Sequence, residues 1–92
     1  MTERRRTQVR VSGRVQGVGF RWWTCDAARA AGLAGWVRNL PGGDVEAEIE
    51  GDADDVARLL VALRSGPPLA HVTAIHVQDM PALGEDGFRI AR

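Results

Sequence analysis

The chain has 92 residues, and we expect one domain over residues 1–92. Twelve basic and twelve acidic side chains balance, so the sequence gives no general electrostatic footprint for nucleic acid or an anionic membrane. Cys25 is the only cysteine, which excludes an intramolecular disulfide. No apolar run approaches the roughly 20 residues that cross a bilayer, and none follows the charged N-terminus as in a signal peptide. We therefore expect a cytoplasmic protein with no membrane partner.

The first predicted element is a strand. Residues 1–6 are polar and are predicted to be a flexible tail. From Thr7 the sequence alternates, with Val9, Val11 and Val15 on one face and polar side chains on the other, which predicts a half-buried strand. Gly13 falls on the inward face, so we expect either a bulge or the close approach of another element there.

A glycine-rich loop follows, and it holds three glycines and a terminal arginine within nine residues, Gly13-Arg14-Val15-Gln16-Gly17-Val18-Gly19-Phe20-Arg21. A strand, a glycine-rich loop and a helix start gather backbone N–H groups around an anion. We predict a phosphate cradle with Arg21 as its positive charge. The alternative is that Gly17 and Gly19 serve only a tight turn. Arg21 at a helix start opposes the helix dipole, which favours a functional role for it.

Residues 22–31 predict a helix, since they include four alanines and few β-branched residues. Its apolar stripe is expected to consist of Phe20, Trp23, Ala27, Ala30 and Ala31. Gly32 is the expected C-terminal cap. Cys25 is expected to be a small buried residue rather than a reactive thiol. The three tryptophans, Trp22, Trp23 and Trp36, are expected to pack in the core or at its rim rather than stack on bases.

Residues 35–50 predict a hairpin whose turn is Pro41-Gly42-Gly43-Asp44. In its second strand, three apolar residues alternate with three glutamates, Glu46, Glu48 and Glu50. These carboxylates are interpreted as a solvated face rather than as a metal site, because no histidine accompanies them.

The second half of the chain predicts a helix and two strands. Asp52 is the expected N-cap of a helix that buries Val56, Leu59, Leu60 and Leu63 and ends at residues 66–68. Residues 69–78 predict a strand. His71 and His76 would lie on its opposite faces, so a paired metal or acid–base role is not expected. After a loop at residues 79–86, Phe88 and Ile90 mark a short final strand.

The element order is therefore β-α-β-β-α-β with a short extra C-terminal strand. It predicts a ferredoxin-like α+β sandwich, with two helices on one face of a mainly antiparallel sheet. The usual catalytic parts are missing: there is no Cys/His zinc set, no G-x-S-x-G elbow, and neither a Walker A nor a G-x-G-x-x-G motif. What remains is the loop with Arg21, together with Asn39, whose alternative role is a plain turn former at a strand end.

Two stretches carry a family resemblance. Residues 9–21 (VRVSGRVQGVGFR) resemble the first signature of the acylphosphatases, and residues 32–39 (GLAGWVRN) resemble the second. Shorter matches follow at Val45-Glu46, Glu50-Gly51, Gly66-Pro67 and Val72, so the resemblance spans nearly the whole chain from about Val9 to Ile90.

The resemblance implies an enzyme that hydrolyses small acyl phosphates to a carboxylate and inorganic phosphate. The family's phosphate-binding arginine falls on Arg21 and its water-positioning asparagine on Asn39. Its cradle of backbone N–H groups falls on Gln16, Gly17, Val18, Gly19 and Phe20. No metal or cofactor is implied, and a monomer is expected. The substrate's own phosphate is one candidate acceptor for the water's proton, which the sequence neither supports nor excludes.

The chemistry fits these residues. A carboxylate leaving group is a weak base that departs without a proton, so the site has little need for a general acid. Two other readings stay open. The same sandwich serves as a single-stranded RNA-binding module, although that use favours exposed aromatic residues and net positive charge. It could also be a regulatory or carrier domain of a larger maturation enzyme.

Overall fold

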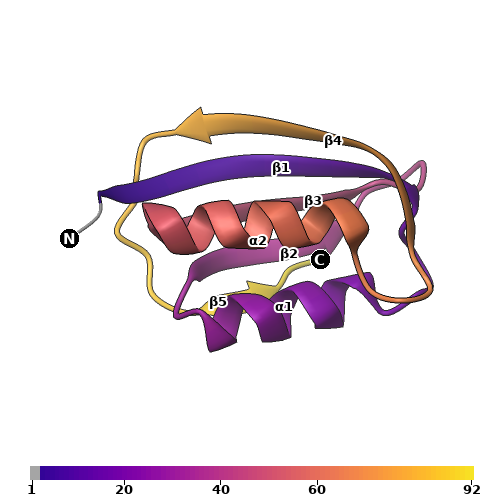
Figure 1. Ribbon diagram of the computed structural model, residues 1–92, viewed down its shortest axis with the longest axis horizontal. Helices are drawn as coiled ribbons and strands as arrows, with labels where there is room; N and C mark the ends of the chain where they lie inside the picture. Colours follow the sequence, from indigo (N-terminus) through magenta and orange to yellow (C-terminus); the bar gives the residue numbers. More distant parts are fainter. Residues whose placement is uncertain (1–2) are drawn as a thin grey trace.

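A computed structural model describes residues 3–92 of the chain (Figure 1). Its elements are β1 (Arg4–Arg14), α1 (Phe20–Ala30), β2 (Ala34–Asn39), β3 (Val45–Asp52), α2 (Ala53–Ser65), β4 (His71–Met80) and β5 (Phe88–Ile90). The strands form one sheet in the order β4-β1-β3-β2-β5. All neighbours are antiparallel except β2 and β5, which are parallel. Both helices cover the same face of the sheet, which confirms the predicted α+β sandwich and its short extra strand.

The core lies between the sheet and the helices, and the alternation in the sequence predicts its strand residues. Val9, Val11 and Val15 are buried, as are the apolar residues of β3. Helix α2 buries the four expected residues, and the Asp52 side chain accepts a hydrogen bond from the Asp54 N–H, as an N-cap does. Gly13 marks a register shift between β1 and β4, and a Cβ there would lie 2.2 Å from the His71 carbonyl oxygen. Both expectations for Gly13 are therefore confirmed.

The buried stripe of α1 differs from the predicted one. Its buried residues are Phe20, Thr24, Cys25 and Ala28, whereas Ala30 and Ala31 are exposed. Trp23 and Ala27 are only partly buried against the core. The stripe is rotated because this helix offers small or apolar side chains on several faces, and contact with the sheet selects one of them. Cys25 is buried, as expected.

The N-terminal tail is a second correction. Met1 and Thr2 lie outside the described residues, but β1 already begins at Arg4, and Arg6 is only 1% exposed. Strand β1 pairs with β3 along its whole first half, from Arg4 opposite Asp52 onward. Residues 4–6 are therefore an integral part of the sheet, because the strand pairing continues on the N-terminal side of Val9, the first apolar residue of β1.

The row of glutamates on β3 is a third correction. Glu50 is fully buried and Glu48 only 15% exposed. The connection between β4 and β5 passes around this end of the sheet (Figure 1), and its Leu83 and Gly84 N–H groups donate to the Glu50 carboxylate. At this end the row is a covered ion cluster rather than a solvated face.

No helix in the described part of the chain is long and apolar enough to cross a membrane.

Candidate active site

The predicted cradle lies between β1 and α1, at the end of the sheet where β1 terminates. Gly17 and Gly19 have φ values of 74° and 80°, a left-handed conformation in which L side chains are strained. A Cβ added at either position would meet no atom within 4 Å, so the conformation and not crowding requires glycine there. The loop is anchored by its flanking apolar residues, since Val15 and Phe20 are buried.

The N-terminus of α1 is open to an anion. Gly19 is its N-cap and has no side chain to satisfy the first N–H groups, and the first turn contains no acidic residue. The opposite holds for α2, whose N-terminus is capped by Asp52 and has Asp54 and Asp55 in its first turn. The positive end of α1 is thus uncompensated by any side chain of its own first turn.

Arg21 is the second residue of α1 and is half-buried. Within residues 3–92 its guanidinium has neither an ion pair nor a side-chain hydrogen bond. Five arginines of β1 and β2, in contrast, pair with carboxylates, namely Arg4, Arg5, Arg6, Arg10 and Arg38. A cation beside the positive end of a helix, with no protein anion to balance it, is suited to bind an anionic ligand.

Asn39 is the last residue of β2 and lies opposite Val45 of β3. It shares the helix-facing side of the strand with Val37, which is fully buried. Its side-chain oxygen Oδ1 is buried and has no hydrogen-bond partner. A buried polar atom without a partner is costly, so this oxygen is suited to accept a hydrogen bond from a water or a ligand.

The two predicted motifs meet through one side chain. Gln16 Nε2 donates to the Leu40 carbonyl oxygen at 2.8 Å and to the Asp44 carbonyl oxygen at 2.9 Å. The cradle therefore contacts the β2–β3 turn directly beyond Asn39. Val45 pairs with both Val11 and Asn39, so the ends of β1 and β2 also flank the same strand of the sheet.

The three tryptophans do not behave alike. Trp23 packs against Phe20 with ring centroids 5.7 Å apart. Trp36 lies under the Arg38 guanidinium at 5.1 Å on the open face. Trp22, next to Arg21, is 67% exposed, so the expected packing role is wrong for this residue. Both histidines are exposed. They do not lie on opposite faces as expected, because the register shift places His76 opposite Arg10 and His71 opposite Arg14, two residues of the same face of β1.

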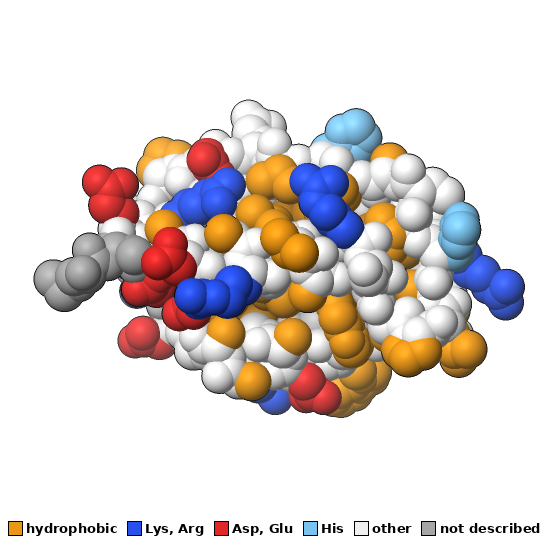
Figure 2. Space-filling model, in the orientation of Figure 1, with side chains coloured by type: hydrophobic (Ala, Val, Ile, Leu, Met, Phe, Trp, Pro, Cys, Tyr) orange, Lys and Arg blue, Asp and Glu red, His pale blue; other side chains and the backbone are white. Residues whose placement is uncertain are grey.

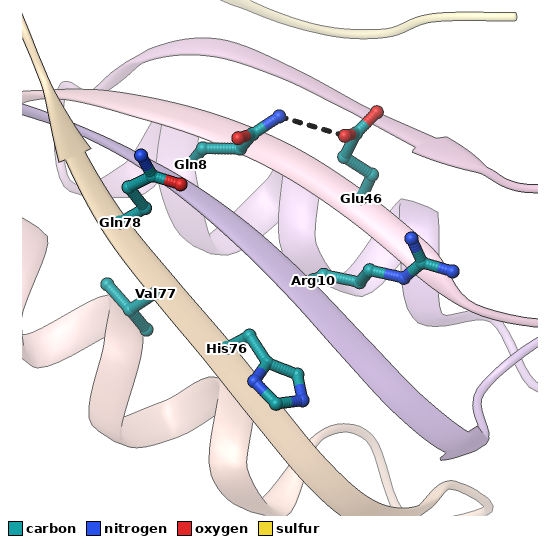
Figure 3. A pocket seen from close by; sticks show the side chains of 6 residues that line it. All are labelled: Gln8, Arg10, Glu46, His76, Val77 and Gln78. Atoms are coloured by element: carbon teal, nitrogen blue, oxygen red, sulfur yellow. Dashed lines mark hydrogen bonds between the residues drawn. The ribbon is translucent and has the colours of Figure 1, made fainter.

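A hollow of about 400 Å³ lies elsewhere, on the open face of the sheet. It is lined by Gln8, Arg10, Glu46, His76, Val77 and Gln78, whose side chains project from β1, β3 and β4 (Figure 3). Three of these are already engaged: Gln8 donates to Glu46, as the dashed line shows, and Arg10 donates to Asp44. The hollow contains none of the predicted site residues. Among residues 3–92, no group of three or more His, Cys, Asp or Glu side chains could hold a metal ion.

The prominent charged cluster that the sequence analysis missed lies at the other end of the sheet. Arg6 contacts Glu48 at 2.6 Å, Glu50 at 2.9 Å and Glu85 at 2.7 Å. Burial alone would raise the pKa of Glu50, but the Leu83 N–H, Arg4, Arg6 and the Gly84 N–H donate to it and lower its pKa to about 2. The sequence shows an arginine run at residues 4–6 and a row of glutamates on β3. Only the register between β1 and β3 shows that the two face each other.

The structure is an α+β sandwich whose predicted anion cradle lies between its first strand and its first helix. The family model described as Acylphosphatase matches residues 7–90. An acylphosphatase of Thermococcus kodakarensis is 50% identical over 88 residues, which cover 96% of this chain and 97% of the relative. The chain belongs to the acylphosphatase family, hydrolases of acid anhydrides.

Solved structures agree. The crystal structure of acylphosphatase from Bacillus subtilis matches with a TM-score of 0.92 at 37% identity, covering 96% of this chain and 99% of that one. Full-length HypF, in its phosphate- and nucleotide-bound form, matches with a TM-score of 0.91 at 27% identity. The match covers all of this chain but 12% of HypF, so the same fold also occurs as a small part of a longer protein.

Proposed function

We propose that this protein hydrolyses small acyl phosphates to a carboxylate and inorganic phosphate, with Arg21 and the loop amides binding the phosphoryl group and Asn39 positioning the attacking water. The observation that carries the proposal is the pairing of an arginine free of ion pairs at an uncapped helix N-terminus with a buried, partnerless Asn39 Oδ1 on the strand next to it. The expected cytoplasmic location and monomeric state remain predictions.

The reaction asks for charge stabilisation rather than proton transfer. In phosphoryl transfer, negative charge spreads over the equatorial oxygens while attacking and leaving oxygens lie in line. The planar Arg21 guanidinium supplies two parallel N–H donors and a positive charge to the phosphoryl oxygens. The N–H groups of residues 16–20 add preorganised dipoles, each donor of this kind being worth roughly 3–4 kcal/mol at a transition state.

Asn39 supplies orientation. Its Oδ1 accepts a hydrogen bond from water, which holds the nucleophile on the side of the cradle instead of leaving it to diffuse there. The leaving carboxylate is a weak base and needs no proton from the protein. The acceptor of the water's proton is open, and the phosphoryl oxygens of the substrate are the candidate that the resemblance suggests.

The test is hydrolysis of acetyl phosphate and benzoyl phosphate in EDTA. The wild-type chain is expected to be active, and Arg21→Ala and Asn39→Ala are each expected to lose most of the rate. Arg64→Ala is the matched control, since Arg64 is an exposed arginine in the last turn of α2. Full activity of either site variant would overturn the assigned roles, and an inactive wild-type chain would favour the binding-module alternative.

A further inference from the structure

The Gln16 side chain has a role that is separate from its backbone N–H in the cradle. Its Nε2 carries two N–H groups, and each donates to a carbonyl oxygen of the β2–β3 turn, one on Leu40 and one on Asp44. Both acceptors are backbone carbonyls, so only the amide nitrogen of Gln16 can satisfy them, and this fixes the orientation of the side chain.

The two carbonyls bracket Asn39 in the fold. Leu40 follows Asn39 directly, and Asp44 directly precedes Val45, the residue opposite Asn39 in the β2–β3 ladder. The turn is closed on itself by Leu40 N–H donating to the Asp44 carbonyl at 2.8 Å. Gln16 therefore joins the cradle to both sides of the turn at the point where β2 ends.

Asn39 depends on its backbone for its position. Its Oδ1 makes no hydrogen bond within the described residues, so that atom is not held by a partner. The direction in which its amide points follows from where β2 ends, and the Gln16 bridge ties that end to the loop. The Arg10 Nε donates to Asp44 Oδ2 at 2.6 Å and secures the far side of the same turn to β1.

We infer that Gln16 is a positioning residue: its side chain keeps the β2–β3 turn in register with the cradle, so that water held by Asn39 faces the phosphoryl group held by Arg21. The inference rests on the proposed function. It separates two tasks within one loop residue, because the backbone N–H serves phosphate binding and the side chain serves the geometry of attack.

The test uses Gln16→Met, which keeps the length of the side chain and removes both of its N–H donors. Gln8→Met is the matched control, since Gln8 also donates from Nε2 at 2.9 Å, but to Glu46 on the open face. For each variant, kcat, the inhibition constant of inorganic phosphate and the thermal unfolding midpoint are measured. Gln16→Met is expected to lower kcat about tenfold, which corresponds to ~1.4 kcal/mol of barrier. The phosphate inhibition constant is expected to stay within about twofold, because the cradle amides and Arg21 are unchanged.

A double variant checks that the effect passes through Asn39. In the Asn39→Ala background, Gln16→Met is expected to cost less than about twofold in kcat, since coupled residues are not additive. The inference is wrong if the loss is the same in both backgrounds, if phosphate affinity falls in proportion to kcat, or if Gln16→Met matches Gln8→Met. Should Gln16→Met fail to fold, Gln16→Asn, which keeps the amide but shortens its reach, takes its place with the same expected split.

The two proposals fail in different ways. An inactive wild-type chain would reject the proposed function itself, and a fully active Arg21→Ala variant would reject the role assigned to Arg21. An inactive Arg21→Ala variant beside a fully active Gln16→Met variant would leave the proposed function standing and reject the positioning role alone.

Discussion

At the scale of single residues, the site consists of groups whose ordinary partners are missing. Arg21 stands at the positive end of a helix without a carboxylate, and Asn39 Oδ1 is buried without a donor. If these residues had only a structural role, each arrangement would destabilise the fold, because no protein group offsets it. A bound phosphoryl group and an ordered water would satisfy both, which is why these two residues and not the exposed histidines carry the proposed chemistry.

Arg21→Lys tests the geometry of the charge. Lysine keeps the positive charge but cannot form two parallel N–H contacts to phosphoryl oxygens. We expect a loss of about 10²-fold or more in kcat/KM, the size seen when a transition-state donor is removed. Steady-state hydrolysis of benzoyl phosphate measures it, with Arg64→Lys on α2 as the control. A variant within twofold of wild type would show that charge alone is sufficient.

Gly19→Ala tests the conformation of the cradle. Gly19 and Gly32 lie at the two ends of α1 with φ values of 80° and 70°, and a Cβ meets no atom at either place. Both alanine variants are expected to lose roughly 1–2 kcal/mol of stability, because alanine is strained in the left-handed region. Chemical unfolding measures that loss of stability. The rate of acyl phosphate hydrolysis is expected to fall for Gly19→Ala alone. Equal activity of the two variants would argue that the loop glycines form only a turn.

At the scale of elements, the two ends of the sheet have different tasks. At the end that holds the cradle, loops β1–α1 and β2–β3 are tied together by Gln16. At the other end, the β4–β5 connection is held down on the open face by hydrogen bonds to Glu50, beside the Arg6 cluster. This second tie secures the connection that leads to β5, the strand paired with the edge of β2.

Glu50→Gln tests that tie. Because the folded-state pKa of Glu50 is about 2, below its ordinary 4.5, its stabilising contribution is present above about pH 4.5 and is lost as the pH falls toward 2. Glu50→Gln is expected to cost about 3 kcal/mol at pH 7, because it breaks a buried ion pair. The variant should also lose stability less steeply than wild type between pH 4.5 and 2. Urea unfolding across this range measures both effects, with Glu46→Gln, from the same row of β3, as the control.

At the scale of the whole molecule, charge is balanced and dispersed. The chain has no net charge, and the face shown in Figure 2 has basic and acidic side chains interspersed rather than a basic patch. On the open face, the glutamates of β3 accept from Gln8, Arg38 and Arg6, and Trp36 is covered by Arg38. Paired cations and a covered aromatic ring differ from the free cations and open aromatic platforms on which single-stranded nucleic acid is bound.

Accordingly, we expect no binding of single-stranded RNA at micromolar protein and about 0.1 M salt, since an electrostatic contribution would require phosphate contacts from unpaired basic residues. Fluorescence anisotropy of a labelled oligonucleotide over a salt series measures this. Salt-dependent binding that Trp36→Ala weakens would revive the module alternative.

The sequence alone predicted the order of elements, the residues of the strand core and the candidate site. The reason is that period-two alternation, an N-capping Asp52 and glycines before a helix are local signals, and the family signatures are contiguous. The sequence-based prediction failed where burial depends on contacts between elements that are distant in the sequence. The rotated stripe of α1, the burial of Arg6 and Glu50, and the exposure of Trp22 all depend on which element covers which face.

The tertiary structure alone decided how the two motifs meet. Gln16 and Leu40 are 24 residues apart, and nothing in their local sequence indicates that an amide of one motif donates to a carbonyl beside the other. That contact exists because β3 lies between β1 and β2, so the C-terminal ends of β1 and β2 lie at the same end of the sheet. The sequence determined which groups are available for the proposed chemistry, and the antiparallel pairing brought the loops that carry them to the same end of the sheet.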